Sequence, residues 1–551
     1  LVRGYNPAKL QVLSARQHRT TPTRIYRDAT RWWLSGDLRF GQFIRLHPWD
    51  TRPTMSRDDT NAAESSAVER RPDCEKIDME GEGLRDPNIV DFDGPNDPEH
   101  PLNWSTTRKT TSIVIVSLTA LLSPIGSTIS AAAAADIMQH FGTTNETLGA
   151  LMTTIYLLGY AFGPVIIAPL SELYGRAIVF QSCTLMFTIF NIACAVANSF
   201  GSLVVYRLLA GIAGSCAGTS GAGSIADMIV REKRGAVMSA YIMGPTLGPT
   251  IGPIIGGNLT ATAGWRWGFW LMAIASGVMA VFIIFFLHES YPYVILKRKT
   301  ARLRQNTGNQ NLRSALDANA SKTPSQLFAF SILRPLKMLI SPIIFLMSVY
   351  TAIVFSYAYL CFTTFPRIFK DQYGFGSGAS GLTSIGLGVG FIIGLLFVGT
   401  VSDPWFAHLT KKNGVAKPEY RLPTFIVGAV FVPIGLFWYG WSAEYKAHWI
   451  VPIIGTAFTG IGIVTAYTTT STYLIDAYTV YSASVMAASA ILRCVFGALL
   501  PLAGSAMFDA LGVGWGNSVL GFISLAFLPL PLILFFYGER IRKSRLWKME
   551  L

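Results

Sequence analysis

The chain has 551 residues, of which 51% are hydrophobic and only 14% are charged, whereas soluble domains carry roughly 25% charged residues. This composition excludes an ordinary soluble protein and indicates a membrane protein with many spans. We attribute the net charge of +13 to lysines and arginines that set membrane topology. The expected partner is therefore a lipid bilayer and not a nucleic acid.

The apolar residues form twelve blocks, each close to the roughly 20 residues that a helix needs to cross about 30 Å of hydrocarbon. The blocks lie at residues 111–133, 147–170, 177–197, 202–224, 236–259, 267–287, 341–363, 380–402, 423–441, 449–472, 484–507 and 515–537. Continuous blocks that contain glycine and proline favour helices over barrel strands, which alternate over about ten residues. We therefore expect an all-α membrane protein of twelve transmembrane helices.

A polar connection, residues 288–340, separates the sixth block from the seventh. The chain thus divides into an N-terminal six-helix half, residues 111–287, and a C-terminal six-helix half, residues 341–537. Lysines and arginines gather in the connections that follow even-numbered blocks, which predicts that both termini are cytoplasmic. The central connection would then be a cytoplasmic loop, and residues 538–551 would be a short cytoplasmic tail.

The segment before the first block has two parts. Residues 1–54 begin with Leu and carry nine arginines and three acidic residues. We interpret them as an over-extended gene prediction or a non-native leader ahead of Met55, with a mitochondrial transit peptide as the alternative. Residues 55–110 are expected to be a disordered cytoplasmic tail, because their composition is polar and acidic.

Cysteine and histidine spacing gives no sign of a metal centre. The six cysteines and seven histidines include no CxxC pair and no pair with metal-ligand spacing. No cluster of ligands or nucleophiles is present either, so we expect no metal, no cofactor and no enzyme activity. Among four N-x-S/T sequons, Asn145 in the first external loop is the candidate for glycosylation, and an unused sequon is the alternative.

A tight turn joins the second and third blocks. Residues 163–177 read GPVIIAPLSELYGRA, in which Glu172 stands three residues before Gly175 and Arg176 follows. This stretch resembles the loop signature G-x-x-x-D-x-x-G-R-[KR] of the major facilitator superfamily, although Ala168 and Ala177 depart from it.

The resemblance implies a gate at the cytoplasmic end. In that family the acid caps a helix of the opposite half, which would be the part of Glu172. Arg176 would pair with Asp227 at the inner end of the fourth span, close to Arg231, and would hold the inside closed in the outward-facing state. The alternative is that Glu172 and Arg176 are ordinary interfacial charges.

Two arginines lie within predicted spans. An arginine inside a span costs roughly 2.5–3.5 kcal/mol on insertion scales, so it is expected to face polar neighbours or water. Arg207 and Gly211 resemble the R-x-x-x-G motif of the same superfamily, whose arginine is implicated in proton coupling, and a snorkelling side chain is the alternative. Arg493 is its candidate counterpart in the C-terminal half, and no carboxylate lies in mid-span between them.

The fifth block, YIMGPTLGPTIGPIIGGNL at residues 241–259, contains glycines four residues apart. These glycines form one stripe along a helix and would let a neighbouring backbone approach closely. The prolines free the carbonyls of Tyr241, Pro245 and Pro249, so surrounding protein must cover the gaps. A simple packing helix is one interpretation of this pattern.

The same block resembles the fifth-span signature G-x-x-x-G-P-x-x-G-G of superfamily members that exchange substrate for protons. The matching residues are Gly248, Gly252, Pro253, Gly256 and Gly257. Importers generally lack this signature, so the resemblance implies export.

Over residues 98–543 the chain resembles the fungal twelve-spanner drug:proton antiporters of the superfamily. The resemblance implies two pseudo-symmetric halves and alternating access, with export of drugs, toxins or the cell's own secondary metabolites. The energy source would be the proton gradient. We expect a monomer in the plasma membrane, with a vacuolar or vesicle membrane as the alternative. The competing hypotheses are a nutrient or polyamine permease of the same fold and a non-transporting membrane sensor.

Aromatic residues within the spans are candidates for lining a substrate cavity. They are Tyr156, Tyr160, Tyr350, Tyr357, Tyr467 and Tyr473. Because no acid in mid-span is available to select a cation, they favour a neutral or anionic, amphipathic, ring-containing small molecule. Core or lipid-facing aromatics are the alternative.

Overall fold

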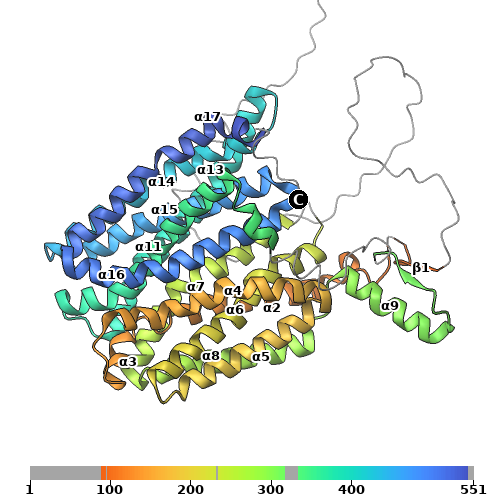
Figure 1. Cartoon of the computed structure of the whole chain (residues 1–551), viewed down its shortest axis with the longest axis horizontal. Helices are drawn as coiled ribbons and strands as arrows, with labels where there is room; N and C mark the ends of the chain where they lie inside the picture. The colour runs from red at the N-terminus through yellow and green to blue at the C-terminus, as the bar shows by residue number, and fades with distance from the viewer. Residues whose placement is uncertain (1–87, 95, 231–233, 317–332, 544–551) are drawn as a thin grey trace, which may run out of the picture. The chain divides into compact units, whose positions relative to one another are not determined.

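The computed structural model describes residues 88–94, 96–230, 234–316 and 333–543, which belong to one compact unit, residues 82–551. Figure 1 shows long helices lying side by side within this unit. The N-terminal half consists of α2 (Thr106–Thr128), α3 (Ala134–His140), α4 (Glu146–Tyr174), α5 (Arg176–Ala195), α6 (Phe200–Met228), α7 (Arg234–Ala263) and α8 (Arg266–Phe286).

The C-terminal half repeats this arrangement. It consists of α11 (Pro342–Tyr373), α12 (Ser377–Leu382), α13 (Ile385–Asn413), α14 (Leu422–Glu444), α15 (Ile450–Ala477), α16 (Ser482–Phe527) and α17 (Pro529–Lys543). Short 3₁₀ turns occur at η1 (Pro101–Asn103), η2 (Pro418–Arg421) and η3 (Thr479–Tyr481). Helix α17 carries the last span six residues beyond the predicted end at 537.

Ten segments among the described residues are long and apolar enough to cross a membrane. One of them, residues 482–542, bends at Gly512, whose φ of 76° and ψ of 170° interrupt the helix. Beyond the bend, Gly516 packs against Phe508, so the chain turns back on itself. Helix α7 is not among the ten, and a count of twelve is reached in the described chain when α7 and both legs of α16 are taken as spans.

Glycine stripes set the closest helix pairs. In the N-terminal half, Gly159 of α4 faces the carbonyl of Leu208 in α6, and a Cβ at that position would overlap it. In the C-terminal half, Gly390 of α13 faces the carbonyl of Ala457 in α15 in the same way. These two helix pairs occupy corresponding places in the halves, as expected of a structural repeat.

The two halves meet mainly where α4 packs on α16 and where α7 packs on α12 and α13. Among the described residues, two hydrogen bonds cross this boundary. The hydroxyls of Ser127 and Tyr359 lie 3.0 Å apart. Ser377 donates to the carboxylate of Asp136 at 2.9 Å, at the end of the bundle that carries α3.

The segment before α2 is ordered where the structure describes it, so the prediction of a disordered tail up to residue 110 is wrong for these residues. The central connection likewise contains α9 (Pro292–Thr307). Strand β1 (Ile89–Val90) pairs in parallel with β2 (Arg313–Ser314), as Figure 1 shows beside α9. Composition predicted disorder because it does not register a partner segment some 220 residues away in the chain.

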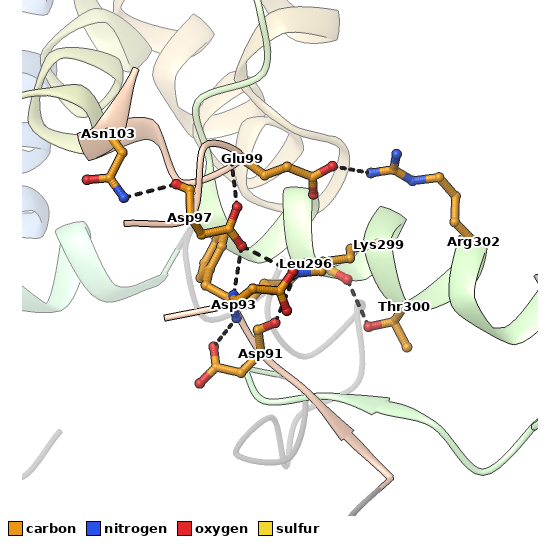
Figure 2. A network of polar contacts seen from close by, with 10 residues as sticks. Asp91, Asp93, Asp97, Glu99, Asn103, Leu296, Lys299, Thr300 and Arg302 are labelled. Atoms are coloured by element: carbon orange, nitrogen blue, oxygen red, sulfur yellow. Dashed lines mark hydrogen bonds and ion pairs between the residues drawn. The ribbon is translucent and has the colours of Figure 1, made fainter. Parts of the chain in front are cut away.

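A buried carboxylate fixes this contact, which Figure 2 shows. Asp97 accepts hydrogen bonds from the backbone N–H groups of Asp93 and Glu99 at 2.8 and 2.7 Å. Lys299 of α9 lies 3.3 Å from Asp97 and 2.9 Å from Asp93. The N–H donors, that of Asp93 first, together with Lys299, hold the pKa of Asp97 below its ordinary value. Residues 88–94 and 96–105 are therefore anchored to α9 and β2 of the central connection.

Candidate functional site

Arg207 is fully enclosed among three helices of the N-terminal half. Its guanidinium donates to the carbonyls of Gly126 and Ser127 in α2 at 2.7 and 2.8 Å. It also donates to the carbonyls of Met152 and Thr153 in α4 at 3.1 and 3.4 Å. Only 1% of the residue is exposed, so the snorkelling interpretation is wrong.

Helix geometry explains why this arginine needs no acid. Gly126 and Ser127 lie in the last turn of α2, where carbonyls lose their partners within the helix and the helix dipole is negative. The guanidinium satisfies these carbonyls and at the same time binds α2 and α4 to α6. The arrangement makes Arg207 a clamp inside one half.

Arg493 of α16 has a different environment. Its guanidinium carbon lies 4.5 Å from the ring centre of Tyr467 in α15 and 4.9 Å from that of Phe355 in α11. Within the described ranges no carboxylate lies within 4.0 Å of it, and its Nε has no hydrogen-bond partner. Arg493 is half-buried, whereas Arg207 is buried completely, so the two intramembrane arginines have different environments.

The glycine stripe of α7 packs against α2. A Cβ at Gly256 would overlap the carbonyl of Ile129, and one at Gly252 would overlap the hydroxyl of Thr128 and approach the carbonyl of Ile125. At Gly248 a Cβ would crowd the Pro124 ring. The close backbone approach predicted for these glycines is confirmed.

Thr128 also satisfies a carbonyl that a proline leaves free. Pro253 has no N–H for the carbonyl of Pro249, and the Thr128 hydroxyl donates to this oxygen at 2.8 Å. The prediction that neighbouring protein covers such a gap is confirmed at this position. The α7 motif therefore depends on a partner in α2, Thr128, that the sequence of the motif does not predict.

The last glycine of the motif faces the other half. A Cβ at Gly257 would crowd the carbonyl of Ser377 and the Cα of Gly381 in α12, and Gly381 in turn packs on the carbonyl of Pro253. Thus one side of α7 packs within its half and the other side forms part of the boundary between the halves.

The loop motif forms a cluster of charges at the end of the bundle opposite α3. Arg176 lies 3.6 Å from Asp227 at the end of α6, and it donates to Ser171 at 2.6 Å. Gly175 has φ 104° and ψ 160°, and a Cβ there would overlap the carboxylate of Glu289. A residue other than glycine would be strained and blocked at this turn.

Glu289, which directly follows α8, caps the start of α5. Its carboxylate accepts from the N–H groups of Arg176 and Ala177 at 2.8 and 3.2 Å. Glu172 is exposed and has no polar contact among the described residues, so its implied role as a cap on the opposite half is wrong in this conformation. Sequence reasoning missed this capping role of Glu289, because Glu289 lies 113 residues from Arg176 in the chain. Arg231 lies outside the described residues.

The C-terminal half has a counterpart of this cluster that the sequence reasoning missed. Arg421, between α13 and α14, pairs with Asp476 at the end of α15 and with Asp403 of α13, the latter at 2.9 Å. The repeat of the two halves could have predicted this cluster, because Arg421 and Asp476 occupy the places in the C-terminal half that Arg176 and Asp227 occupy in the N-terminal half. Each pair lies within one half, so neither pair bridges the halves.

The six tyrosines divide into two groups. Four are at most 1% exposed and pack inside one half, so the expectation that they line a cavity is wrong; these are Tyr156, Tyr350, Tyr357 and Tyr473. Their hydroxyls or rings face core partners, as Tyr156 does with Ser123 at 2.7 Å. Tyr160 and Tyr467 are half-buried near the boundary between the halves. Sequence alone cannot separate core from cavity when every helix face is apolar.

A cavity of about 520 Å³ opens at the α3 end between the halves. Glu146 contributes to its lining from the N-terminal half, and Arg367, Asp371 and Asp509 from the C-terminal half. Arg367 pairs with Asp509 at 2.6 Å and lies 3.7 Å from Asp371. Asn145 is exposed and caps the start of α4, where its side chain accepts a hydrogen bond from the N–H of Thr147. Its glycosylation stays a prediction.

Comparisons with known proteins agree with this architecture. Residues 116–501 match the family model of the Major Facilitator Superfamily, so the chain belongs to this superfamily. It is 53% identical over 464 residues to the MFS-type transporter penM of Penicillium rubens, covering 84% of this chain and 91% of that protein. It is 41% identical over 470 residues to the efflux pump radE of Floropilus chiversii, covering 85% and 87%. The protein is thus a multi-pass membrane transporter and not an enzyme.

Solved structures support the same fold. The xylose transporter XylE from E. coli, in a partially occluded inward open conformation, matches with a TM-score of 0.57 at 15% identity, covering 78% of this chain and 98% of that chain. A bacterial homologue of the human lysosomal transporter Spinster matches with a TM-score of 0.57 at 15% identity, covering 80% and 98%.

Proposed function

We propose that the protein is a proton-coupled exporter of small amphipathic organic compounds that works by alternating access. The observation that carries this proposal is the packing of α7, whose glycine motif lies against α2 on one side and against α12 on the other. A helix shared in this way can transmit a movement within one half to the boundary between the halves. The name of the relative radE, an efflux pump, supports the outward direction.

We assign the conformation described here to the inward-facing state of that cycle. At the α3 end, Ser377 bonds to Asp136 and Gly257 packs on α12, so the halves are joined there beside the cavity that opens at the same end. The charge clusters at the other end each stay within one half. The distribution of lysine and arginine predicts that this second end is cytoplasmic, and cargo would then enter from the cytoplasm.

Proton coupling in this proposal involves the two intramembrane arginines through their charge. An arginine keeps its proton at all accessible pH values, so Arg207 and Arg493 would act on a proton held by a carboxylate elsewhere. The proton gradient would be the only energy source, with no bound cofactor. We further propose a monomer in the plasma membrane, with cargo that includes drugs, toxins or secondary metabolites.

Efflux from yeast cells that lack their own drug pumps tests the proposal. Cells expressing the protein should retain less Nile red, cycloheximide or azole than control cells, and a protonophore should abolish the difference. Arg207→Ala and Gly252→Val should reach the membrane and lose export. Normal efflux by both variants would contradict the assignment, and substrate uptake with acidification of the cytoplasm would instead identify an importing permease.

A further inference from the structure

We propose that Arg493 is the binding site for an anionic group on a ring-containing substrate, so that the cargo class includes aromatic carboxylates. The inference rests on the proposed transport function and goes beyond it by naming a ligand chemistry and the residue that receives it. It follows from the contrast between the two intramembrane arginines.

Arg493 lacks the backbone partners that Arg207 has. Arg207 directs its guanidinium at four backbone carbonyls. Arg493 makes no hydrogen bond of this kind in the described chain, and its Nε is buried without a partner. A charge within a span is costly unless it is paired or solvated. An anion that binds here would therefore offset a cost that the protein alone leaves open.

Arg493 lies close to residues of the opposite half. One helical turn further along α16, Gly497 packs against Leu157 of α4, which belongs to the opposite half. Tyr160 of α4 packs against the core cluster formed mainly by the C-terminal half, and it interacts electrostatically with Arg493. Arg493 thus stands at the boundary between the halves, where alternating access requires the substrate site to be.

Aromatic rings surround the guanidinium of Arg493. Tyr467 and Phe355 present ring faces to the guanidinium, with 4.5 and 4.9 Å between its carbon and the ring centres. Together with Tyr160 they are half-buried, whereas the tyrosines of the half cores are buried completely. Ring faces cover a guanidinium without using its N–H donors, so the donors of Arg493 that do not interact with the side chains of Tyr467 and Cys494, Nε among them, stay available for the oxygens of a carboxylate.

Two ring-containing acids and their uncharged esters provide the test. Accumulation of 1-naphthoate, anthracene-9-carboxylate or their methyl esters would be measured in everted membrane vesicles that carry the wild-type protein. A proton gradient across the vesicle membrane would drive the accumulation. Binding of the same four compounds to purified protein would be measured by the shift in its unfolding temperature. A charge-assisted bidentate contact predicts a preference for acid over ester of about ten- to a hundredfold in apparent affinity.

Arg493→Gln should remove the preference while ester binding stays unchanged, which also shows that the variant is folded. Arg493→Lys should retain part of the preference, because lysine keeps the positive charge but lacks the paired N–H donors that bind both oxygens of a carboxylate. Ser489→Ala, one turn earlier on α16, is the matched control and should behave as wild type. A preference that survives in Arg493→Gln, or no preference of the wild type in either assay, would overturn the inference.

The two assays separate this inference from the proposed function. Vesicles that accumulate the neutral esters but never the acids, with no acid preference in binding, would refute the anion site and leave export standing. An Arg493-dependent acid preference in binding without any proton-driven accumulation would support the site and refute export.

Discussion

Thr128 of α2 donates a hydrogen bond of 2.8 Å to the carbonyl oxygen of Pro249 in α7. This oxygen is free because Pro253, four residues on, has no N–H to give it. The hydroxyl therefore replaces a backbone bond that the proline removes, from a helix more than a hundred residues away in the chain. The bent, glycine-lined α7 is stable in this bundle because α2 supplies what α7 lacks.

Replacement of Thr128 by Val should destabilise the protein. The change keeps the shape of the side chain but leaves the Pro249 carbonyl buried without a donor, at a cost of about 1–3 kcal/mol. We expect a lower unfolding temperature of the purified protein and weaker transport. Thr119→Val is the control, because within the part of the chain that the structure describes the Thr119 hydroxyl bonds only to the Ile115 carbonyl of its own helix. Equal effects of both changes would contradict this account.

Replacement of Gly256 by Leu should separate α7 from α2. Even a Cβ at this position overlaps the Ile129 carbonyl, so the helices must move apart and the Thr128 contact is lost. We expect a large loss of transport, measured with protein levels in the membrane. Gly235→Ala, in the same helix, has no atom within 4 Å of the new Cβ and should be neutral or slightly stabilising. Activity in Gly256→Leu close to wild type would show that close packing is not required.

The acid that caps α5 should matter more than the acid of the loop motif. Glu289→Ala leaves the N–H groups of Arg176 and Ala177 without their acceptor at the start of α5. Loss of such a cap costs about 0.5–2 kcal/mol, so a lower unfolding temperature is expected. Glu172→Gln should change the unfolding temperature little, because Glu172 is exposed. A larger effect of Glu172→Gln would restore the role that the family resemblance implies.

The contact between residues 88–105 and α9 should depend on pH through Asp97 and Lys299. Hydrogen bonds from the N–H groups of Asp93 and Glu99 lower the pKa of Asp97, so its stabilisation is present above the unfolded value of about 3.9 and is lost as pH falls through the lower folded value. Although burial opposes the shift, bonds to Asp93 and Asp97 raise the pKa of Lys299. Its stabilisation is present below about 10.4 and is lost as pH rises through the higher folded value.

Hydrogen exchange of residues 88–105 measures this contact. We expect protection at neutral pH and faster exchange in Asp97→Asn, which weakens the ion pair with Lys299. Asp91→Asn is the control, since among the described residues the Asp91 side chain bonds only to the N–H of Phe92 beside it. Protection in Asp97→Asn equal to wild type at neutral pH would rule out the ion pair as the anchor.

The sequence was sufficient wherever local chemistry decides the outcome. Block lengths predicted the spans, because a helix that crosses hydrocarbon needs a set number of apolar residues. The spacing of Gly248, Gly252 and Gly256 predicted a close helix contact, because residues four apart share one face. Gly175 predicted a turn, and the observed positive φ explains why that position holds a glycine.

Other features depend on which segments meet, and no local pattern contains that information. The six candidate tyrosines of α4, α11 and α15 look alike in sequence, yet of these six only Tyr160 and Tyr467 are half-buried. Disorder was predicted for residues that β2 and α9 in fact hold in place.

The sequence by itself determined the class of protein, the order and the approximate positions of the spans, and the motifs of a transporter. It did not determine where every helix ends, because α11 ends at Tyr373 and α13 at Asn413, ten and eleven residues beyond the predicted span ends at 363 and 402. Only the tertiary structure decided that Arg207 is satisfied by carbonyls of α2 and α4, whereas Arg493 is not paired in this way. The physical reason is that the cost of a charge in a membrane depends on the donors and acceptors brought to it by other helices. Two arginines that the sequence presents as equivalents thereby acquire different roles.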